Sequence, residues 1–320
     1  MRSFDGGESS IVRTPVWSHF RATSVALAAM GMLAYAAIVS PPVLAVGYPA
    51  PGGIYEPFTD CPLHDPEMRL AEPGFAMGCI KSITAGGSFT VNGIPVIITH
   101  PVTVQFGTYS DTDSTGNQVF HVVPPQDHKT LLTEPEVIPS GFQLLVCLSG
   151  DPNVERLCET AMTSGHTDLS VQVELAGPIT NFSPLALIPF TLPVKVKLGN
   201  PLLGGQCYIG SDDDPILLNP TFNPVGSLAF EGDPDPVRFP NVAVLSITGS
   251  TLTDDVFSVP AATHCGPGGI ADDSINAFLG LPSPSGNNHL VLTGNDALFA
   301  DDFAASDQAR DLLAAFMASR

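Results

Sequence analysis

The residues best suited to chemistry are carboxylates gathered in turn-like segments. Asp111 and Asp113 lie in the segment DTDSTG, which places oxygen ligands at the first, third and fifth positions and a glycine at the sixth, as at the start of a calcium-binding loop. Val122 stands at the twelfth position, where such a loop needs a bidentate Glu. The competing interpretation is a polar hairpin tip without metal, and the missing ligand favours it.

A second candidate calcium site is the acidic segment SDDDP, which contains Asp212, Asp213 and Asp214. Adjacent carboxylates repel each other, so these side chains stay in water unless a cation joins them. Any calcium site would have to combine several acidic loops, and their relative positions do not follow from the sequence. Solvated acidic turns are therefore the competing interpretation. Other acidic turns of this kind contain Asp233 and Asp235, Asp254 and Asp255, and Asp272 and Asp273.

Motifs for catalysis or cofactor binding are not found in the chain. It has no GxSxG nucleophile elbow, no CxxC and no Cys/His spacing of a zinc site. The glycine-rich segment after Cys265 lacks the lysine and the βαβ setting of a phosphate-binding loop. A Ser/His/Asp triad is recognised by geometry and not by order along the chain, so a secreted hydrolase of polysaccharide or ester remains an alternative. We assign no catalytic and no cofactor-binding residue.

Cysteines are the residues that indicate how the protein is held together. All six lie beyond residue 45, and an even number in an exported chain indicates disulfides. Many pairings are possible, and joining sequence neighbours gives one of them. The expected bonds are then Cys61–Cys79, Cys147–Cys158 and Cys207–Cys265.

An export signal is predicted at the N-terminus. Val25–Val39 is an uninterrupted apolar run of 15 residues, the length of a signal-peptide core and short for a membrane span. Small residues follow, so we expect a signal peptide over residues 1–45 with cleavage after Ala45, or as second choice after Ala50. The leader has no twin-arginine pair, which favours the general secretory route. The alternative is an uncleaved single-span anchor, the one way in which we expect membrane contact.

The net charge limits the partners. The chain carries a formal charge of −20. Nucleic acids and anionic membranes are bound through basic patches, so both are excluded as partners of the exported part. The acidity is compatible with a solvated extracellular protein and with calcium binding.

The elements that position these residues are short strands, recognised by a period of two. In Leu192–Leu198 the apolar residues alternate with Lys195 and Lys197. Asn92-Gly93 between two apolar runs predicts a hairpin with a type I′ turn, with strands at 87–91 and 94–99. Further strands are expected at 102–106, 118–123, 142–148, 168–175, 206–209, 216–218, 227–230, 242–247, 256–259 and 289–292.

About a dozen short strands separated by turn residues predict an all-β fold, a sandwich or a barrel. One minor helix is expected from Asp151-Pro152 to about Thr163, ended by Gly165. The expected domain organisation is a Pro/Gly linker over 46–57, one β-domain over 58–295 and a helical or disordered tail over 296–320. A split of the domain near Asn200 is the alternative.

Three stretches of the chain resemble one family. They are CPLHDPEM, LPVKVKLGNPLLGGQCYIGSDDDPI and LPSPSGNN, at residues 61–68, 192–216 and 281–288. They resemble a group of secreted, cysteine-containing, β-rich proteins of actinobacteria that has no assigned function. The resemblance implies export and an actinobacterial origin, and it transfers no site.

These observations together predict an exported, disulfide-stabilised extracellular protein of structural or surface-interaction type, without catalysis. Its partner would be a cell-surface or extracellular component that the sequence does not identify. The alternatives are the secreted hydrolase and a calcium-dependent adhesive module, for which the candidate ligands are the five aspartates of the two acidic segments.

Overall fold

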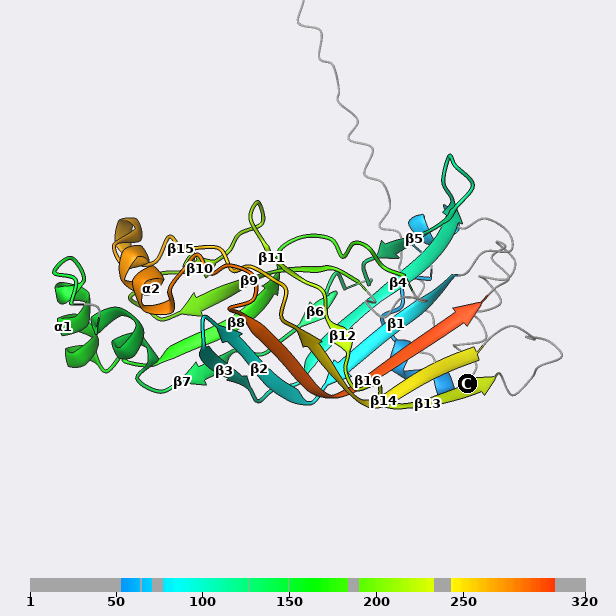
Figure 1. Cartoon of the computed structure of the whole chain (residues 1–320), viewed down its shortest axis with the longest axis horizontal. Coiled ribbons are helices and arrows are strands. Elements are labelled where there is room, and N and C mark those ends of the chain that lie inside the picture. The colour runs from blue at the N-terminus through cyan, green and yellow to red at the C-terminus, as the bar shows by residue number, and fades with distance from the viewer. Residues whose placement is uncertain are drawn as a thin grey trace, which may run out of the picture. The chain divides into compact units, whose positions relative to one another are not determined.

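The structure is a computed structural model, and the residues it describes all belong to the compact unit formed by residues 47–320 (Figure 1). The expected signal peptide with its cleavage sites, the first part of the expected linker, and residues 303–320 of the expected tail lie outside the described residues. The described ranges are 53–63, 65–70, 77–125, 127–148, 150–183, 190–232 and 243–302.

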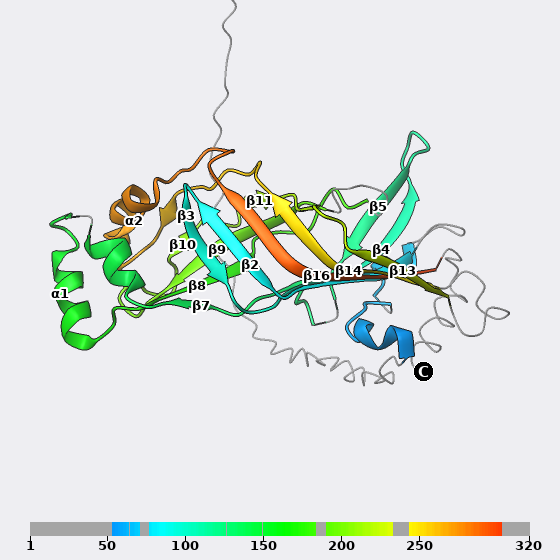
Figure 2. The ribbon, with the colours of Figure 1, turned by 60° about the horizontal axis from the view of Figure 1, so that its bottom comes forward.

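Two antiparallel sheets pack face to face, which confirms the all-β prediction and makes the fold a sandwich (Figure 2). The first sheet has ten strands in the main order β12-β14-β16-β1-β4-β5, with β13 beside β14, β2 beside β16, β3 beside β2 and β6 beside β4. Its strands are β1 (Met77–Thr84), β2 (Gly86–Val91), β3 (Ile94–Ile98), β4 (Val102–Thr112), β5 (Gln118–Val123), β6 (Leu131–Leu132), β12 (Thr221–Phe222), β13 (Ser227–Gly232), β14 (Ala243–Asp254) and β16 (His289–Asp302).

The second sheet has six strands in the order β15-β10-β9-β8-β7, with β11 beside β9. Its strands are β7 (Glu136–Ile138), β8 (Leu169–Leu175), β9 (Leu192–Gly199), β10 (Tyr208–Ile209), β11 (Ile216–Leu218) and β15 (Ala262–Thr263). Because β9 pairs with β10 and β11 across Asn200, the chain is not divided at that residue.

The predicted hairpin is confirmed and belongs to a larger bent pair of strands. Asn92 and Gly93 both have positive φ, 47° and 82°, and Val91 pairs with Ile94. Since β1 and β2 are separated by Ala85 alone and both pair with β16, they act as one long strand bent at Ala85. β3 pairs with β2 and β4 pairs with β1, and these two strands are likewise separated by a bend, at residues 99–101.

Glycine permits this bend on β2. A Cβ atom on Gly87, whose φ is +156°, would collide with the carbonyl oxygen of Val291 on β16. Strand β16 therefore approaches β2 at a distance that only glycine allows.

The long strands extend beyond their predicted ends. β14 continues to Asp254 and β16 to Asp302, whereas the alternation in the sequence predicts ends at 247 and 292. The boundary at 295 is therefore too early, because residues 296–302 are strand and not part of a helical or disordered tail. Their backbone pairs with β14 on one side and β1 on the other, and this pairing overrides the helical preference of an alanine-rich segment.

The buried strand expected at 142–148 is wrong. Residues Gln143–Cys147 form a π-helix, η3. Phe142, Leu145 and Val146 are buried, whereas Leu144 and Leu148 are 46% and 66% exposed, which is the periodicity of a helix. A short apolar run fits a buried strand and a buried helical turn equally well, so periodicity alone does not decide between them.

The structure contains more helices than the single minor helix predicted from the sequence. α1 (Glu155–Ser164) begins later than expected, because Asp151 accepts the N–H of Asn153 in a preceding turn, and it ends as predicted at Gly165 with φ +77°. A second helix that was not expected, α2 (Asp272–Leu279), follows the 3-10 turn η4 (Pro267–Gly269). η3 contacts both α1 and α2, and these helices gather at one end of the sandwich (Figure 1).

Two expectations at short segments also need correction. The strand expected at 256–259 is reduced to an isolated bridge between Val259 and Ser283. The second half of the expected linker is folded, since Gly53–Phe58 forms a 3-10 helix, η1, in which Tyr55 is fully buried. A further 3-10 helix, η2, covers Glu67–Leu70.

All three predicted disulfides are present. Cys61–Cys79 joins the segment after η1 to β1, and Cys147–Cys158 joins η3 to α1. Cys207–Cys265 joins the residue before β10 to the loop before α2. Each bond therefore ties a helical or irregular segment to a neighbouring element.

Candidate functional site

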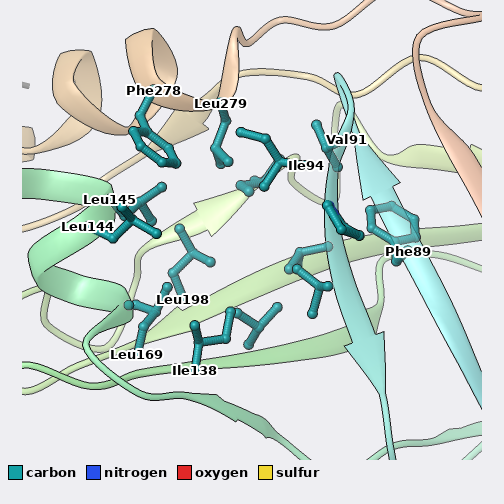
Figure 3. Close-up of a pocket in the computed structure, with 16 residues that line it drawn as sticks. Phe89, Val91, Ile94, Ile138, Leu144, Leu145, Leu169, Leu198, Phe278 and Leu279 are labelled. Atoms are coloured by element: carbon teal, nitrogen blue, oxygen red, sulfur yellow. The ribbon is translucent and has the colours of Figure 1, made fainter. Parts of the chain in front are cut away.

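A cavity of about 150 Å³ lies between the two sheets, at the end where η3 and α2 meet (Figure 3). The hairpin β2–β3 forms one wall and β7–β10 form the other, while Leu144 and Leu145 of η3 and Phe278 and Leu279 of α2 close the end. The remaining lining residues are Phe89, Val91, Ile94, Pro95, Val96, Ile138, Gly141, Leu169, Val171, Val196, Leu198 and Ile209.

The lining contains no ionisable, hydroxyl or amide side chain. A cavity of this size with such a lining stays dry, and an engineered cavity of about 150 Å³ lined by Leu, Ile and Phe binds benzene or xenon. The chemistry available here is therefore binding of a hydrocarbon group. It is not acid–base or nucleophilic catalysis.

The alternation predicted from the sequence builds the wall that β8 and β9 contribute to this cavity and its neighbours. On β8 and β9, Val171 pairs with Leu198 and Val173 with Val196, so their apolar side chains form rows on the inner face. The intervening Lys195 and Lys197 lie on the outer face, where both contact the ring of Tyr208. What the sequence does not show is which residues of the first sheet face these rows.

Two smaller cavities continue from the main one. Their volumes are about 60 and 40 Å³. Phe89 lines all three cavities, and its ring stacks on Phe257 with the centroids 5.5 Å apart. Phe89 thus lies where the three cavities adjoin.

Ionisable side chains line the cavities beside the bend between β3 and β4, whereas the 60 Å³ cavity is lined by the hydroxyl residues Ser82, Thr84 and Thr133. His100, Glu134 and Glu136 line the 40 Å³ cavity. Glu136 Oε1 accepts the backbone N–H groups of Thr99 (2.6 Å) and His100 (2.9 Å), and Oε2 accepts the Thr99 hydroxyl (2.6 Å). His100 Nδ1 lies 3.1 Å from Glu136 Oε1, an ion-pair distance without hydrogen-bond geometry.

These contacts set the protonation of Glu136. Burial, the largest single influence, raises its pKa, but the hydrogen bonds from Thr99 and His100 together outweigh burial and hold the pKa below its usual range. Glu136 is therefore a carboxylate at neutral pH. Because Thr99 and His100 give it three hydrogen bonds, it is a structural ligand of the bend and not a free acid or base.

The first predicted calcium cluster is a polar hairpin tip between β4 and β5. Asp113 accepts the N–H and hydroxyl of Thr115 (2.8 and 2.7 Å) and the N–H of Asn117 (2.9 Å). The hydroxyl of Thr115 contributes most, and together these bonds lower the pKa of Asp113 to about 2. Asp111 lies 2.9 Å from Nε2 of His121, so the two aspartates are engaged separately.

The second predicted cluster lies in the loop after β10, on the other sheet. Asp212 forms an ion pair with Nζ of Lys195 (2.6 Å), Asp213 is exposed, and Asp214 takes part in a turn with Ser211. The structure does not bring the two acidic clusters together. Within the described ranges, no group of three or more His, Cys, Asp or Glu side chains is arranged to hold a metal ion.

Other acidic candidates support the backbone. Asp254 is buried and accepts the N–H groups of Asn219 (2.5 Å) and Val256 (2.9 Å). Asp272, in the first turn of α2, accepts the N–H of Cys265 (2.7 Å). Asp233 and Asp235 lie outside the described residues.

The stretches that carry the family resemblance contain residues that serve the fold. The amide of Asn200 donates to the carbonyls of His166 and Asp168, and its oxygen accepts the N–H of Leu202. Buried Asn288 accepts the hydroxyl of Ser283 (2.8 Å) and donates to backbone carbonyls. These asparagines satisfy loop backbone groups and lie outside the cavity lining.

No protein-family model, curated protein or solved structure matches this chain. The longest described helix, α1, has 10 residues, and none of the helices in the described ranges qualifies as a membrane span.

Proposed function

We propose that this is an exported, non-catalytic binding protein whose ligand places a hydrocarbon group in the 150 Å³ cavity. The observation that carries the proposal is the exclusively apolar lining of that cavity. Apolar ligand sites are concave, largely preformed and lined by aliphatic and aromatic side chains, as this one is. A binding role of this kind is a specific form of the surface-interaction role expected from the sequence.

Two of the disulfides support a preformed site. Cys147–Cys158 holds η3, which contributes Leu144 and Leu145 to the cavity. Cys207–Cys265 joins the start of β10, which contributes Ile209, to the loop that leads into α2. Bracing η3 and the β10–α2 region reduces the entropy that would otherwise be lost when a ligand orders them.

Export is the second part of the proposal. Three disulfides persist in oxidising compartments, and the apolar run at Val25–Val39 supplies the signal to reach one. The actinobacterial origin implied by the resemblance is in keeping with this. Mass spectrometry of the culture medium tests it: a chain that starts at Val46 and takes up no alkylating reagent before reduction is expected. A cell-bound chain that retains residues 1–45 would contradict export.

Thermal unfolding in the presence of toluene tests the binding function. A ligand that binds only the folded state adds RT ln(1 + [L]/Kd) to the free energy of unfolding, so the Tm should rise with toluene concentration. Val171→Phe places a ring in the cavity and should abolish the rise. Leu175→Phe, on the same strand and face but outside the lining of the three cavities, should leave it intact. A Tm that toluene does not raise in the unmodified protein would refute the proposal.

A further inference from the structure

The three cavities form one series, which extends the space available to a ligand. The 150 and 40 Å³ cavities share the walls Val96, Val171 and Val196. The 40 and 60 Å³ cavities share Ile98 and Val102. A chain of methylene groups is narrow enough to follow such a series, whereas a compact ring system fills only the first cavity.

The middle cavity, of 40 Å³, is where this series meets ionisable groups. β3 is an edge strand of the first sheet and β7 an edge strand of the second, so no strand pairing closes the sandwich between them within the described residues. Glu134 and Glu136 stand on this side of the sandwich together with His100. A ligand with a hydrocarbon chain in the cavities would therefore place its polar head here.

At the middle cavity the negative charge of Glu134 and Glu136 is not balanced by a lysine or an arginine. Neither lysine nor arginine lines any of the three cavities. Glu136 is saturated by donors of the bend, whereas Glu134 is 71% exposed and, within the described part of the chain, forms an ion pair only with His100 Nε2, at 3.8 Å. A negatively charged head group would be repelled by both carboxylates, and a positively charged one would be attracted by Glu134.

We propose that the ligand is a linear alkyl amphiphile whose head group is a hydrogen-bond donor, either cationic, as an ammonium is, or uncharged. Glu134 selects against a carboxylate head group. This inference rests on the proposed function, because it assumes that the hydrocarbon part occupies the cavity. It specifies the head group of the ligand, which the apolar lining of the cavity alone does not determine. Fatty-acid anions, which share the same chain, are rejected by the charge at the middle cavity.

Three ligands of equal chain length test this selection: octylamine, 1-octanol and octanoate, measured by titration calorimetry on the full secreted chain at neutral pH. The expected order of affinity is amine, then alcohol, then carboxylate. Glu134→Gln should reduce the ratio of amine to carboxylate affinity about thirtyfold, because it removes roughly 1 kcal/mol of attraction to the ammonium and roughly 1 kcal/mol of repulsion from the carboxylate at a separation near 4 Å in water. Glu159→Gln, an exposed change on α1 that removes the same charge, should leave the ratio unchanged.

The outcomes separate the two proposals. Octanoate binding as tightly as octylamine, or a ratio that Glu134→Gln does not change, would overturn the inference. If toluene raises the Tm but no octyl compound binds, the inference fails and the proposed function stands. If neither toluene nor any octyl compound binds, the proposed function itself is refuted.

Discussion

The carboxylate of Glu136 accepts both donors of Thr99, its backbone N–H and its hydroxyl, each at 2.6 Å. Thr99 follows β3, at the bend where the ladder between β2 and β3 ends, so its N–H has no strand partner. Glu136 begins β7 of the other sheet. One side chain therefore joins the two sheets at the side where their edge strands do not pair.

Replacing Glu136 by Gln should weaken this junction. The amide NH₂ of Gln would face one of the Thr99 donors, so at least one charge-assisted hydrogen bond is lost, at a cost of about 1.5–3 kcal/mol in the free energy of unfolding. Urea unfolding measures this loss. The matched control is Glu134→Gln, an exposed neighbour whose change should stay within about 0.5 kcal/mol. Equal stabilities of the two variants would contradict the structural role of Glu136.

The contribution of Glu136 should also depend on pH. Its pKa is lower in the folded protein than in the unfolded chain, so between the two values the unfolded state binds more protons and stability rises with pH. The stabilisation is complete above the ordinary Glu pKa of about 4.3 and is lost as the pH falls through the folded value. The difference in unfolding free energy between the unmodified protein and Glu136→Gln should accordingly shrink below about pH 4. A difference that grows on acidification would give the opposite sign and contradict the assignment.

Removing the ring of Phe89 should widen the space where the three cavities adjoin. Phe89→Ala is expected to cost about 3–5 kcal/mol, as for other buried phenylalanines, and to shift the preferred alkyl chain to a longer one. Titration with a series of alkyl amines of increasing length measures the shift. Phe257→Ala removes the stacking partner, which does not line these cavities, and should cost similar stability without changing the preferred length. The same length optimum in both variants would show that the Phe89 ring does not limit the space open to the alkyl chain.

The disulfides should contribute unequally. Cys207–Cys265 closes 58 residues and Cys147–Cys158 closes 11, so the loop-entropy model gives about 4 and about 3 kcal/mol. Cys207 and Cys265 are also fully buried, which adds to the cost of replacing them. Paired Cys→Ala variants compared by chemical unfolding should therefore lose more stability at Cys207–Cys265. A larger loss at Cys147–Cys158 would show that bracing of η3 matters more than loop length.

Asp113 offers a direct test of the calcium-dependent alternative. Its carboxyl should titrate at a pKa of about 2, because the Thr115 hydroxyl and the N–H groups of Asn117 and Thr115 stabilise the charged form. Since the folded pKa is the lower one, the stabilisation is present above the ordinary Asp range and is lost as the pH falls toward 2. NMR titration of the side-chain carbon measures this value. A shift of that resonance on adding millimolar calcium at neutral pH would revive the calcium site.

Local chemistry explains which predictions were confirmed. Asn92-Gly93 needs positive φ at two consecutive residues, so it defines a hairpin wherever the rest of the chain lies. The alternation in β8 and β9 assigns inward and outward faces in the same way, through backbone geometry alone. The disulfide pairs were found because each joins cysteines adjacent in sequence order, separated by at most 58 residues.

The cavity and its polar side depended on tertiary structure. Phe89 and Val171 face each other only because two different sheets are stacked, and nothing in either segment specifies the other. In the sequence Glu136 is one of many carboxylates, and its role becomes visible only through the hydrogen bonds that Thr99 at the bend donates to it. The apolar run of η3 is compatible with a strand as well as with a helix, and its packing against neighbouring segments makes it helical. The sequence by itself thus determined turns, faces and cross-links, which are set within a few residues. Only the packing of distant segments, which balances side-chain volumes against each other, decided where space remained for a ligand.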